Sequence, residues 1–141
     1  EQYNRWVRSI SMRDDLRASV EVGCSAFRLM YQPQVDARTR RLIGAEALLR
    51  WRSPRGRMVA PMEFIPLLEE TKLILPVGKW LLEQAVQQAR AWRALLPDFH
   101  RSVNMRYEQV RDLSFRECVP ACLARYGVPP EAIDSTAPHH R

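Results

Sequence analysis

The most apolar stretch of the chain, residues 42–51, predicts a buried strand that carries charged residues. It reads Leu-Ile-Gly-Ala-Glu-Ala-Leu-Leu-Arg-Trp, and a near-continuous apolar run of this length is typical of a buried strand. Glu46 and Arg50 interrupt the run four positions apart, so they share one face of the strand with Leu48 between them. A buried carboxylate is costly unless something pairs or ligates it. The pattern leaves two interpretations open: a solvated or ion-paired strand end, and a functional site.

Hydrophobic periodicity assigns the other elements. Alternating apolar and polar residues over 26–35 predict a strand, and the polar residues 36–41 predict a turn that joins antiparallel neighbours. Apolar residues at helical spacing predict helices over 2–22, 62–71, 75–95, 108–113 and 118–126, and another short apolar run predicts a strand over 99–105. This order of helices and strands favours an α/β fold with parallel strands.

Particular residues set the expected ends and packing of these helices. Gly23 and Gly127 are expected to end the first and last helices, because glycine readily adopts a left-handed conformation. Pro66 is expected to split or kink its helix, and Pro120 is expected in a first turn, where its missing N–H is tolerated. The expected buried positions are Trp6, Ile10, Leu16 and Val20 in the first helix, and Val77, Leu81, Ala85, Ala89 and Trp92 in the long helix.

Length and cysteine content narrow the class of protein. The 141 residues are enough for one domain with a real core, and without about 18 consecutive apolar residues no membrane span is expected in this segment. The three cysteines Cys24, Cys118 and Cys122 are unpatterned, which favours a reducing compartment and predicts a cytoplasmic protein. A zinc site from Cys118, Cys122, His139 and His140 would lack familiar ligand spacing and is not expected.

The charge balance is basic. The chain has 22 Lys and Arg residues against 16 Asp and Glu, a formal net charge of +6, which suits an anionic ligand or a nucleic acid. No DNA-binding or RNA-binding signature accompanies the arginines, so we expect no DNA partner and a solvated arginine-rich surface. The densest group consists of Arg38, Arg40, Arg41, Arg50, Arg52, Arg55 and Arg57.

Several short motifs in one order resemble the EAL domain family, the cyclic di-GMP-specific phosphodiesterases of bacteria and their inactive relatives. Glu46-Ala47-Leu48 matches the motif that names the family, within a wider pattern ending at Arg50. Residues 31–33 (Tyr-Gln-Pro), residues 61–74 (PMEFIPLLEETKLI) and Val103-Asn104 are similar to three further family motifs. The resemblance implies a (β/α)8 TIM-like barrel, here truncated to its N-terminal half with about three strands and their helices. It divides the chain into an N-terminal linker helix (1–15), a truncated EAL domain (16–133) and a polar tail unlike the family (134–141).

The resemblance also implies a chemistry. In EAL enzymes Mg²⁺ or Mn²⁺ activates a water molecule that attacks a phosphodiester of cyclic di-GMP, giving linear pGpG. The family's metal ligands match Glu46 and Asn104, whose oxygen atoms suit a hard divalent cation. Gln32, Leu48 and Arg50 match positions that hold the dinucleotide, and arginine geometry suits a phosphate.

Other family motifs are missing, so no complete catalytic set is expected and hydrolysis should be very weak or nil. Thr136 stands where a further glutamate ligand is usual, and the Asp-Asp pair, the lysine associated with the catalytic water and the distal glutamate are absent. Lys72 stands where the family usually has Gly. A truncated or frameshifted gene and a tail supplied by an expression vector are both compatible with the abrupt ending.

Three functions remain open from the sequence. The leading hypothesis is a cyclic di-GMP signalling protein of the EAL family, inactive as given. The alternatives are an excerpt of an active cyclic di-GMP phosphodiesterase, and a dimerisation or protein-interaction module without nucleotide binding. A half-barrel exposes strand edges and an apolar face, so a homodimer or higher oligomer is expected.

Overall fold

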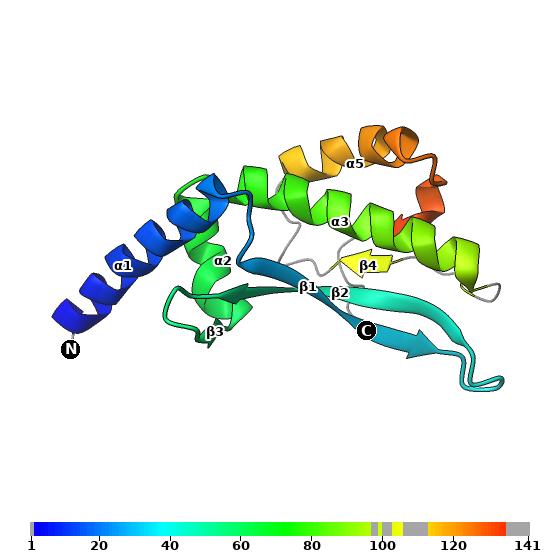
Figure 1. Cartoon of the computed structure of the whole chain (residues 1–141), viewed down its shortest axis with the longest axis horizontal. Helices are drawn as coiled ribbons and strands as arrows, with labels where there is room; N and C mark the ends of the chain where they lie inside the picture. The colour runs from blue at the N-terminus through cyan, green and yellow to red at the C-terminus, as the bar shows by residue number, and fades with distance from the viewer. Residues whose placement is uncertain (1, 97–98, 100–102, 106–112, 135–141) are drawn as a thin grey trace. The chain divides into compact units, whose positions relative to one another are not determined.

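A computed structural model describes residues 2–96, 99, 103–105 and 113–134, and it has the mixed helix and strand composition that the sequence predicts. The elements in chain order (Figure 1) are α1 (Gln2–Glu21), β1 (Phe27–Val35), β2 (Leu42–Arg52), β3 (Met58–Val59), α2 (Pro61–Glu70), α3 (Ile74–Leu95), β4 (Val103–Met105), α5 (Leu113–Arg125), the 3-10 turn η1 (Pro130–Ala132) and β5 (Ile133–Asp134). The helix predicted over 108–113 lies almost wholly outside the described residues.

The strands form one sheet in the order β1-β2-β4-β5, with β3 pairing with β2 beside this path. β2 and β3 are antiparallel, whereas β2 with β4 and β4 with β5 are parallel. The strands predicted over 26–35 and 42–51 are confirmed within a residue. Of the strand predicted over 99–105, Val103–Met105 form β4, Phe99 is not in a strand, and residues 100–102 lie outside the described residues. The two-residue β5 extends the sheet where the sequence showed no further strand.

Strand β2 is more deeply buried on one face than on the other. Glu46, Leu48 and Arg50 are intermediate in exposure, and every second residue between them is buried. β2 is therefore a two-faced strand in this chain, not a strand buried on both faces, and the charged residues occupy its more open face as their spacing predicted. The buried face carries Ile43, Ala45, Ala47, Leu49 and Trp51.

The chain divides into two compact units. Residues 1–28 and 49–77 form the first unit, and residues 29–48 and 78–141 form the second. Strand β2 passes from the second unit into the first between Leu48 and Leu49.

In the first unit, α1 is joined to β2 by a buried hydrogen bond. The indole Nε1 of Trp51 donates to the Ser19 Oγ at 3.1 Å, and both side chains are at least nine-tenths buried. Trp51 also packs against Phe27 and Phe64, with ring centroids 6.3 Å and 6.0 Å away. Leu16 of α1 is fully buried as well. The C-terminal half of α1 thus shares the core of this unit.

The N-terminal half of α1 is more exposed than the sequence predicted. Trp6 is 60% and Ile10 38% exposed, so the expectation that these two residues are buried is wrong. Trp6 and Ile10 are apolar residues at helical spacing, but the buried residues of α1 are Leu16 and Ser19, in its second half. The helix ends as expected near Gly23, which has a φ of 78°.

Two prolines lie inside continuous helices, so the expected split at Pro66 and the expected first-turn position of Pro120 are wrong. Helix α2 continues through Pro66, because Phe64, Ile65 and Leu68 anchor it in the core on both sides of the proline. Helix α5 starts at Leu113, so Pro120 lies in its interior and not in its first turn. Tertiary packing outweighs the lost backbone hydrogen bond in both helices.

In the second unit, α5 lies alongside α3 (Figure 1). Arg125 and Glu83 form an ion pair at 3.6 Å, and the Gln87 amide donates to the Tyr126 hydroxyl at 3.2 Å. Gly127, with a φ of 64°, ends α5 as predicted. The apolar stripe of α3 is also confirmed: Val77, Leu81, Ala85 and Ala89 are buried, and Trp92 is intermediate.

The turn between α2 and α3 has an unusual backbone. Lys72 adopts a φ of 64°, in the left-handed region that favours glycine. Its N–H donates to the Glu69 carbonyl at 3.2 Å, and its carbonyl accepts from the N–H of Leu75 at 3.3 Å. The turn thus keeps the backbone conformation suited to the glycine that is usual in the family resembled.

Candidate functional site

The candidate metal residues occupy one row across the sheet. Glu46 of β2 is the register partner of Asn104 of β4, and Asn104 is in turn the partner of Asp134 of β5. Neighbouring strands lie about 4.8 Å apart, and positions directly paired lie on the same face of a sheet. The structure therefore brings the backbone positions of Glu46 and Asn104 side by side within the second unit, although they are 58 positions apart in the sequence.

This row suits a hard divalent cation in its donor chemistry. A carboxylate on β2 and an amide on the neighbouring strand supply the oxygen ligands that Mg²⁺ prefers. Asp134 adds a carboxylate one strand further along, whereas Thr136 lies outside the described residues. Within the described ranges, no group of three or more His, Cys, Asp or Glu side chains is arranged to hold a metal. Cys118 and Cys122 lie within these ranges.

The candidate dinucleotide residues lie on β1 and β2. Gln32 is exposed on β1, and Leu48 is half-buried on the same face of β2 as Glu46. Arg50 is half-buried, and its Nη1 donates to the Leu49 carbonyl at 3.0 Å. Arg50 belongs to the first unit, whereas Gln32, Glu46 and Leu48 belong to the second.

Tyr31 precedes Gln32 and packs its ring against Trp92, with centroids 4.8 Å apart in a T-shaped arrangement. Burial raises the pKa of the Tyr31 phenol to about 12. A phenol with this pKa stays protonated at neutral pH, so Tyr31 acts here as a packing residue that holds β1 against α3 and not as a proton acceptor.

A family model described as EAL domain matches residues 13–134 of this chain. The chain belongs to the EAL domain family. The resemblance found in the sequence is thereby confirmed, and so is the TIM-barrel-like fold, of which this EAL chain holds a part.

Curated relatives of this EAL chain include enzymes of cyclic di-GMP metabolism. A cyclic di-GMP phosphodiesterase of Pseudomonas aeruginosa is 42% identical over 91 residues, which are 64% of this chain and 16% of the relative. The bifunctional diguanylate cyclase/cyclic di-GMP phosphodiesterase MucR of the same species is 34% identical over 134 residues, 91% of this chain and 19% of MucR. The EAL chain thus spans less than a fifth of each of these relatives.

Solved EAL structures have the same fold. The MucR phosphodiesterase in complex with c-di-GMP aligns with a TM-score of 0.73 and 34% identity, over 87% of this chain and 49% of that one. The FimX EAL domain of Xanthomonas citri in complex with c-diGMP aligns with a TM-score of 0.67 and 25% identity, over 93% of this chain and 50% of that one. This EAL chain is therefore a relative of cyclic di-GMP phosphodiesterases.

Sequence reasoning named Glu46 and Asn104 but overlooked Asp134, which it placed in the polar tail. The available signal was Ile133, an apolar residue that follows the turn at Pro129-Pro130 and begins β5. Among the described residues, no helix of this EAL chain is both long and apolar enough to span a membrane.

Proposed function

We propose that this EAL chain is a cyclic di-GMP signalling protein that binds the dinucleotide but does not hydrolyse it on its own. Glu46 and Asn104 ligate Mg²⁺ or Mn²⁺, and Gln32, Leu48 and Arg50 hold cyclic di-GMP. The observation that carries the proposal is the register pairing of Glu46 with Asn104, because it places the two matched family ligands on adjacent strands. Membership of a family whose phosphodiesterases depend on a divalent cation supports the same assignment.

Each residue has a distinct task in this proposal. The bound cation offsets phosphate charge and lowers the pKa of water. Glu46 contributes a negative charge and Asn104 a neutral oxygen. Arg50 presents a planar pair of N–H donors that fits two phosphate oxygens, which a lysine cannot reproduce. Leu48, between Glu46 and Arg50 on one face of β2, offers apolar contact to the ligand.

The absence of hydrolysis follows from the ligand set. Thr136 stands where the family resembled has a further glutamate ligand. Glu46 and Asn104 would supply two oxygen ligands, fewer than proteins usually provide for catalysis on a hard divalent cation. A longer chain that supplies the later motifs would be an active phosphodiesterase, which is the alternative function.

We further propose that the chain works in the cytoplasm as a homodimer or higher oligomer. Its organisation is a linker helix (1–15), an EAL segment (16–133) and a polar tail (134–141). Exposed apolar side chains on β1, Met30 at 55% and Val35 at 53%, support a surface that a second copy covers. Sedimentation velocity tests this: a species larger than one chain at micromolar concentration is expected, and a clean monomer contradicts it.

Calorimetric titration with cyclic di-GMP, with and without Mg²⁺, tests the central proposal. We expect binding in Mg²⁺, weaker binding without it, and loss of the Mg²⁺ effect in Glu46→Gln, which keeps the size of the side chain. Glu21→Gln is the matched control, because Glu21 is an exposed carboxylate at the end of α1. Chromatography of the same mixture should show no pGpG.

Three results would overturn parts of this proposal. No heat at high micromolar cyclic di-GMP would leave an interaction module without nucleotide binding. Equal Mg²⁺ dependence in Glu46→Gln and the parent chain would remove Glu46 from the metal site. Accumulation of pGpG that Glu46→Gln abolishes would make the chain an active phosphodiesterase.

A further inference from the structure

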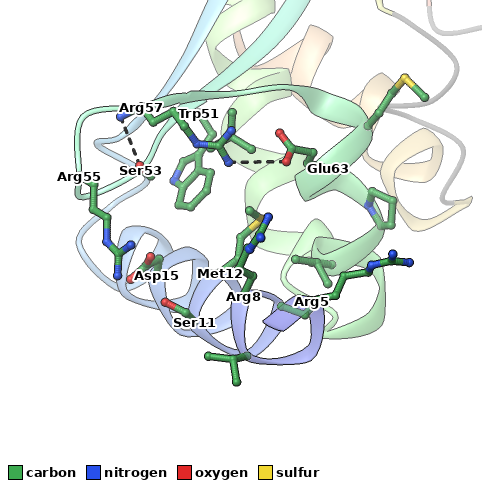
Figure 2. Close-up of a pocket in the computed structure, with 16 residues that line it drawn as sticks. Arg5, Arg8, Ser11, Met12, Asp15, Trp51, Ser53, Arg55, Arg57 and Glu63 are labelled. Carbon is green, nitrogen blue, oxygen red and sulfur yellow. Dashed lines mark hydrogen bonds and ion pairs between the residues drawn. The ribbon is translucent and has the colours of Figure 1, made fainter. Parts of the chain in front are cut away.

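The first unit contains a pocket of about 690 Å³ between α1, the β2–β3 hairpin and α2 (Figure 2). All of its lining residues belong to this unit. Volumes of this size are typical of small-molecule sites. The charged residues of its lining are Arg5, Arg8 and Asp15 of α1, Arg55 and Arg57 of the hairpin, and Glu63 of α2.

The lining carries a surplus of positive charge. Arg57 is ion-paired with Glu63 at 3.5 Å, and its backbone N–H donates to Ser53 Oγ at 3.3 Å. Arg5, Arg8 and Arg55 form no ion pair or hydrogen bond with any other part of the chain that the structure describes. Figure 2 shows Arg8, Arg55 and Arg57 around the same hollow, reaching it from two elements. Like charges held together in this way repel one another until an anion joins them.

Part of the pocket lining is apolar. Met12, Trp51, Val59 and Leu67 contribute to it, and Trp51 and Val59 are 0% and 2% exposed. The only polar atom of the Trp51 ring is bonded to Ser19, so it is not offered to a ligand. The lining therefore offers both apolar side chains and guanidinium groups, which suits a molecule with an organic part and an anionic part.

We propose that this pocket binds a small soluble organic phosphate with at least two negative charges, of the nucleoside polyphosphate class. Guanidinium groups hold phosphate oxygens through paired N–H donors, and Arg8 and Arg55 form no hydrogen bond or ion pair within the described chain. The carboxylates Asp15 and Glu63 lower the net charge of the lining, so a single negative charge is bound weakly. The arginines surround a hollow, which a compact anion fills better than a flat membrane surface does.

The pocket is separate from the proposed cyclic di-GMP residues. Arg50 and Trp51 are consecutive on β2, so their side chains leave opposite faces of the strand, and Trp51 lines the pocket whereas Arg50 does not. A ligand here would bridge α1 and the hairpin, and would raise the thermal stability of the chain by mass action.

The test is calorimetric titration of the 141-residue chain with ATP, pyrophosphate and adenosine, followed by thermal melts in each ligand. We expect ATP to bind more tightly than pyrophosphate, adenosine to bind weakly or not at all, and the melting temperature to rise in ATP and pyrophosphate. Arg8→Gln combined with Arg55→Gln should weaken ATP binding by at least about tenfold, in line with the loss of two charge-assisted contacts.

Arg17→Gln combined with Arg52→Gln is the matched control. It removes the same charge from α1 and β2 at exposed positions outside the pocket, so ATP affinity should change less than about twofold. The melting temperatures of both double variants without ligand check that each variant folds.

Three outcomes would overturn the proposal. Equal losses in the two double variants would mean non-specific attraction to a basic chain. Adenosine binding as well as ATP would mean an apolar site without phosphate recognition. Binding to vesicles rich in phosphatidylserine with no binding of ATP or pyrophosphate would assign the arginines to a lipid surface.

Discussion

Glu46 and Asn104 are register partners across the parallel strands β2 and β4. Parallel pairing requires a crossover, and here the hairpin, α2 and α3 provide it between the two strands. Two residues far apart in the sequence therefore stand in one row of the sheet, about 4.8 Å from each other along the hydrogen-bonding direction. If both bind one cation, their contributions to metal affinity depend on each other.

Mn²⁺ titration of four proteins tests this dependence: the parent chain, Glu46→Gln, Asn104→Ala and the double variant. We expect either single substitution to weaken Mn²⁺ binding by at least about tenfold, as expected for the loss of one ligand. The double variant should bind almost as weakly as the worse single variant, because residues that share a partner are not additive. Fully additive losses would contradict a shared cation, and Glu21→Gln serves as the control for lost charge.

The periodicity of the sequence predicted the elements that position this row. Alternation over 26–35 and the apolar run 42–51 located β1 and β2, and the stripe on α3 was correct because regular apolar spacing records one buried face. The motif Glu46-Ala47-Leu48 and the dipeptide Val103-Asn104 indicated the candidate site. The register between them could not be derived from spacing, since it depends on how the crossover packs.

Expectations failed where packing outweighs local pattern. Trp6 has helical apolar spacing but remains 60% exposed, because spacing says nothing of whether a partner surface exists. Pro66 stays inside a helix with Phe64, Ile65 and Leu68 buried around it, and Pro120 inside a helix in which Val119 and Leu123 are buried. The sequence predicts only a solvated arginine-rich surface, because Arg8 and Arg55 are far apart in the chain. They line one pocket only because α1 packs near the hairpin.

Lys72→Gly should stabilise the chain by roughly 0.5–1 kcal/mol. A non-glycine residue in the left-handed region costs about 1–2 kcal/mol, and the extra chain entropy of glycine offsets part of the gain. Urea unfolding measures the difference. The matched control is Lys79→Gly, at an exposed position inside α3, which should destabilise by about 1 kcal/mol. Destabilisation by Lys72→Gly equal to that of the control would refute the strain at Lys72.

Tyr31→Phe should change how stability depends on alkaline pH. The phenol titrates near 10.0 in the unfolded chain and at about 12 in the folded chain, so the folded state holds this proton more tightly. The stabilisation is complete below pH 10 and is lost as pH rises towards 12. Thermal melts between these pH values should fall more steeply for the parent chain than for Tyr31→Phe. If the melting temperatures of the two proteins fall in parallel with pH, Tyr31 does not contribute to the pH dependence of stability.

The three thiols should react with iodoacetamide in a fixed order. Cys118 is exposed and should react first. Burial raises the pKa of the Cys122 thiol, with a smaller contribution from Glu83, so its thiolate fraction is lower and its reaction slower. Burial also raises the pKa of Cys24, which is 4% exposed and should react only when the chain opens. Peptide mass spectrometry after timed labelling gives the order, and Cys24 labelled as fast as Cys118 would contradict this packing.

Ser19→Ala should destabilise the chain by about 1–2 kcal/mol. The substitution leaves the buried indole N–H of Trp51 without its acceptor, and an unpaired buried donor costs about 1–3 kcal/mol. Ser11→Ala is the control, because Ser11 is exposed on the same helix and alanine favours helices slightly more than serine does. Chemical unfolding should therefore show a lower free energy of unfolding for Ser19→Ala and a slightly higher one for Ser11→Ala. Equal changes in the two variants would show that the Ser19–Trp51 bond does not stabilise the chain.

The Ser19–Trp51 bond also couples the rotation of α1 about its axis to the position of the Trp51 ring. The bond joins the second half of the helix to the residue that follows Arg50, and Trp51 is held in place by Phe27 and Phe64. A rotation of α1 about its own axis would therefore have to break this bond or move Trp51 against Phe27 and Phe64. The orientation of the helix within this unit thus depends on one buried hydrogen bond and three aromatic rings.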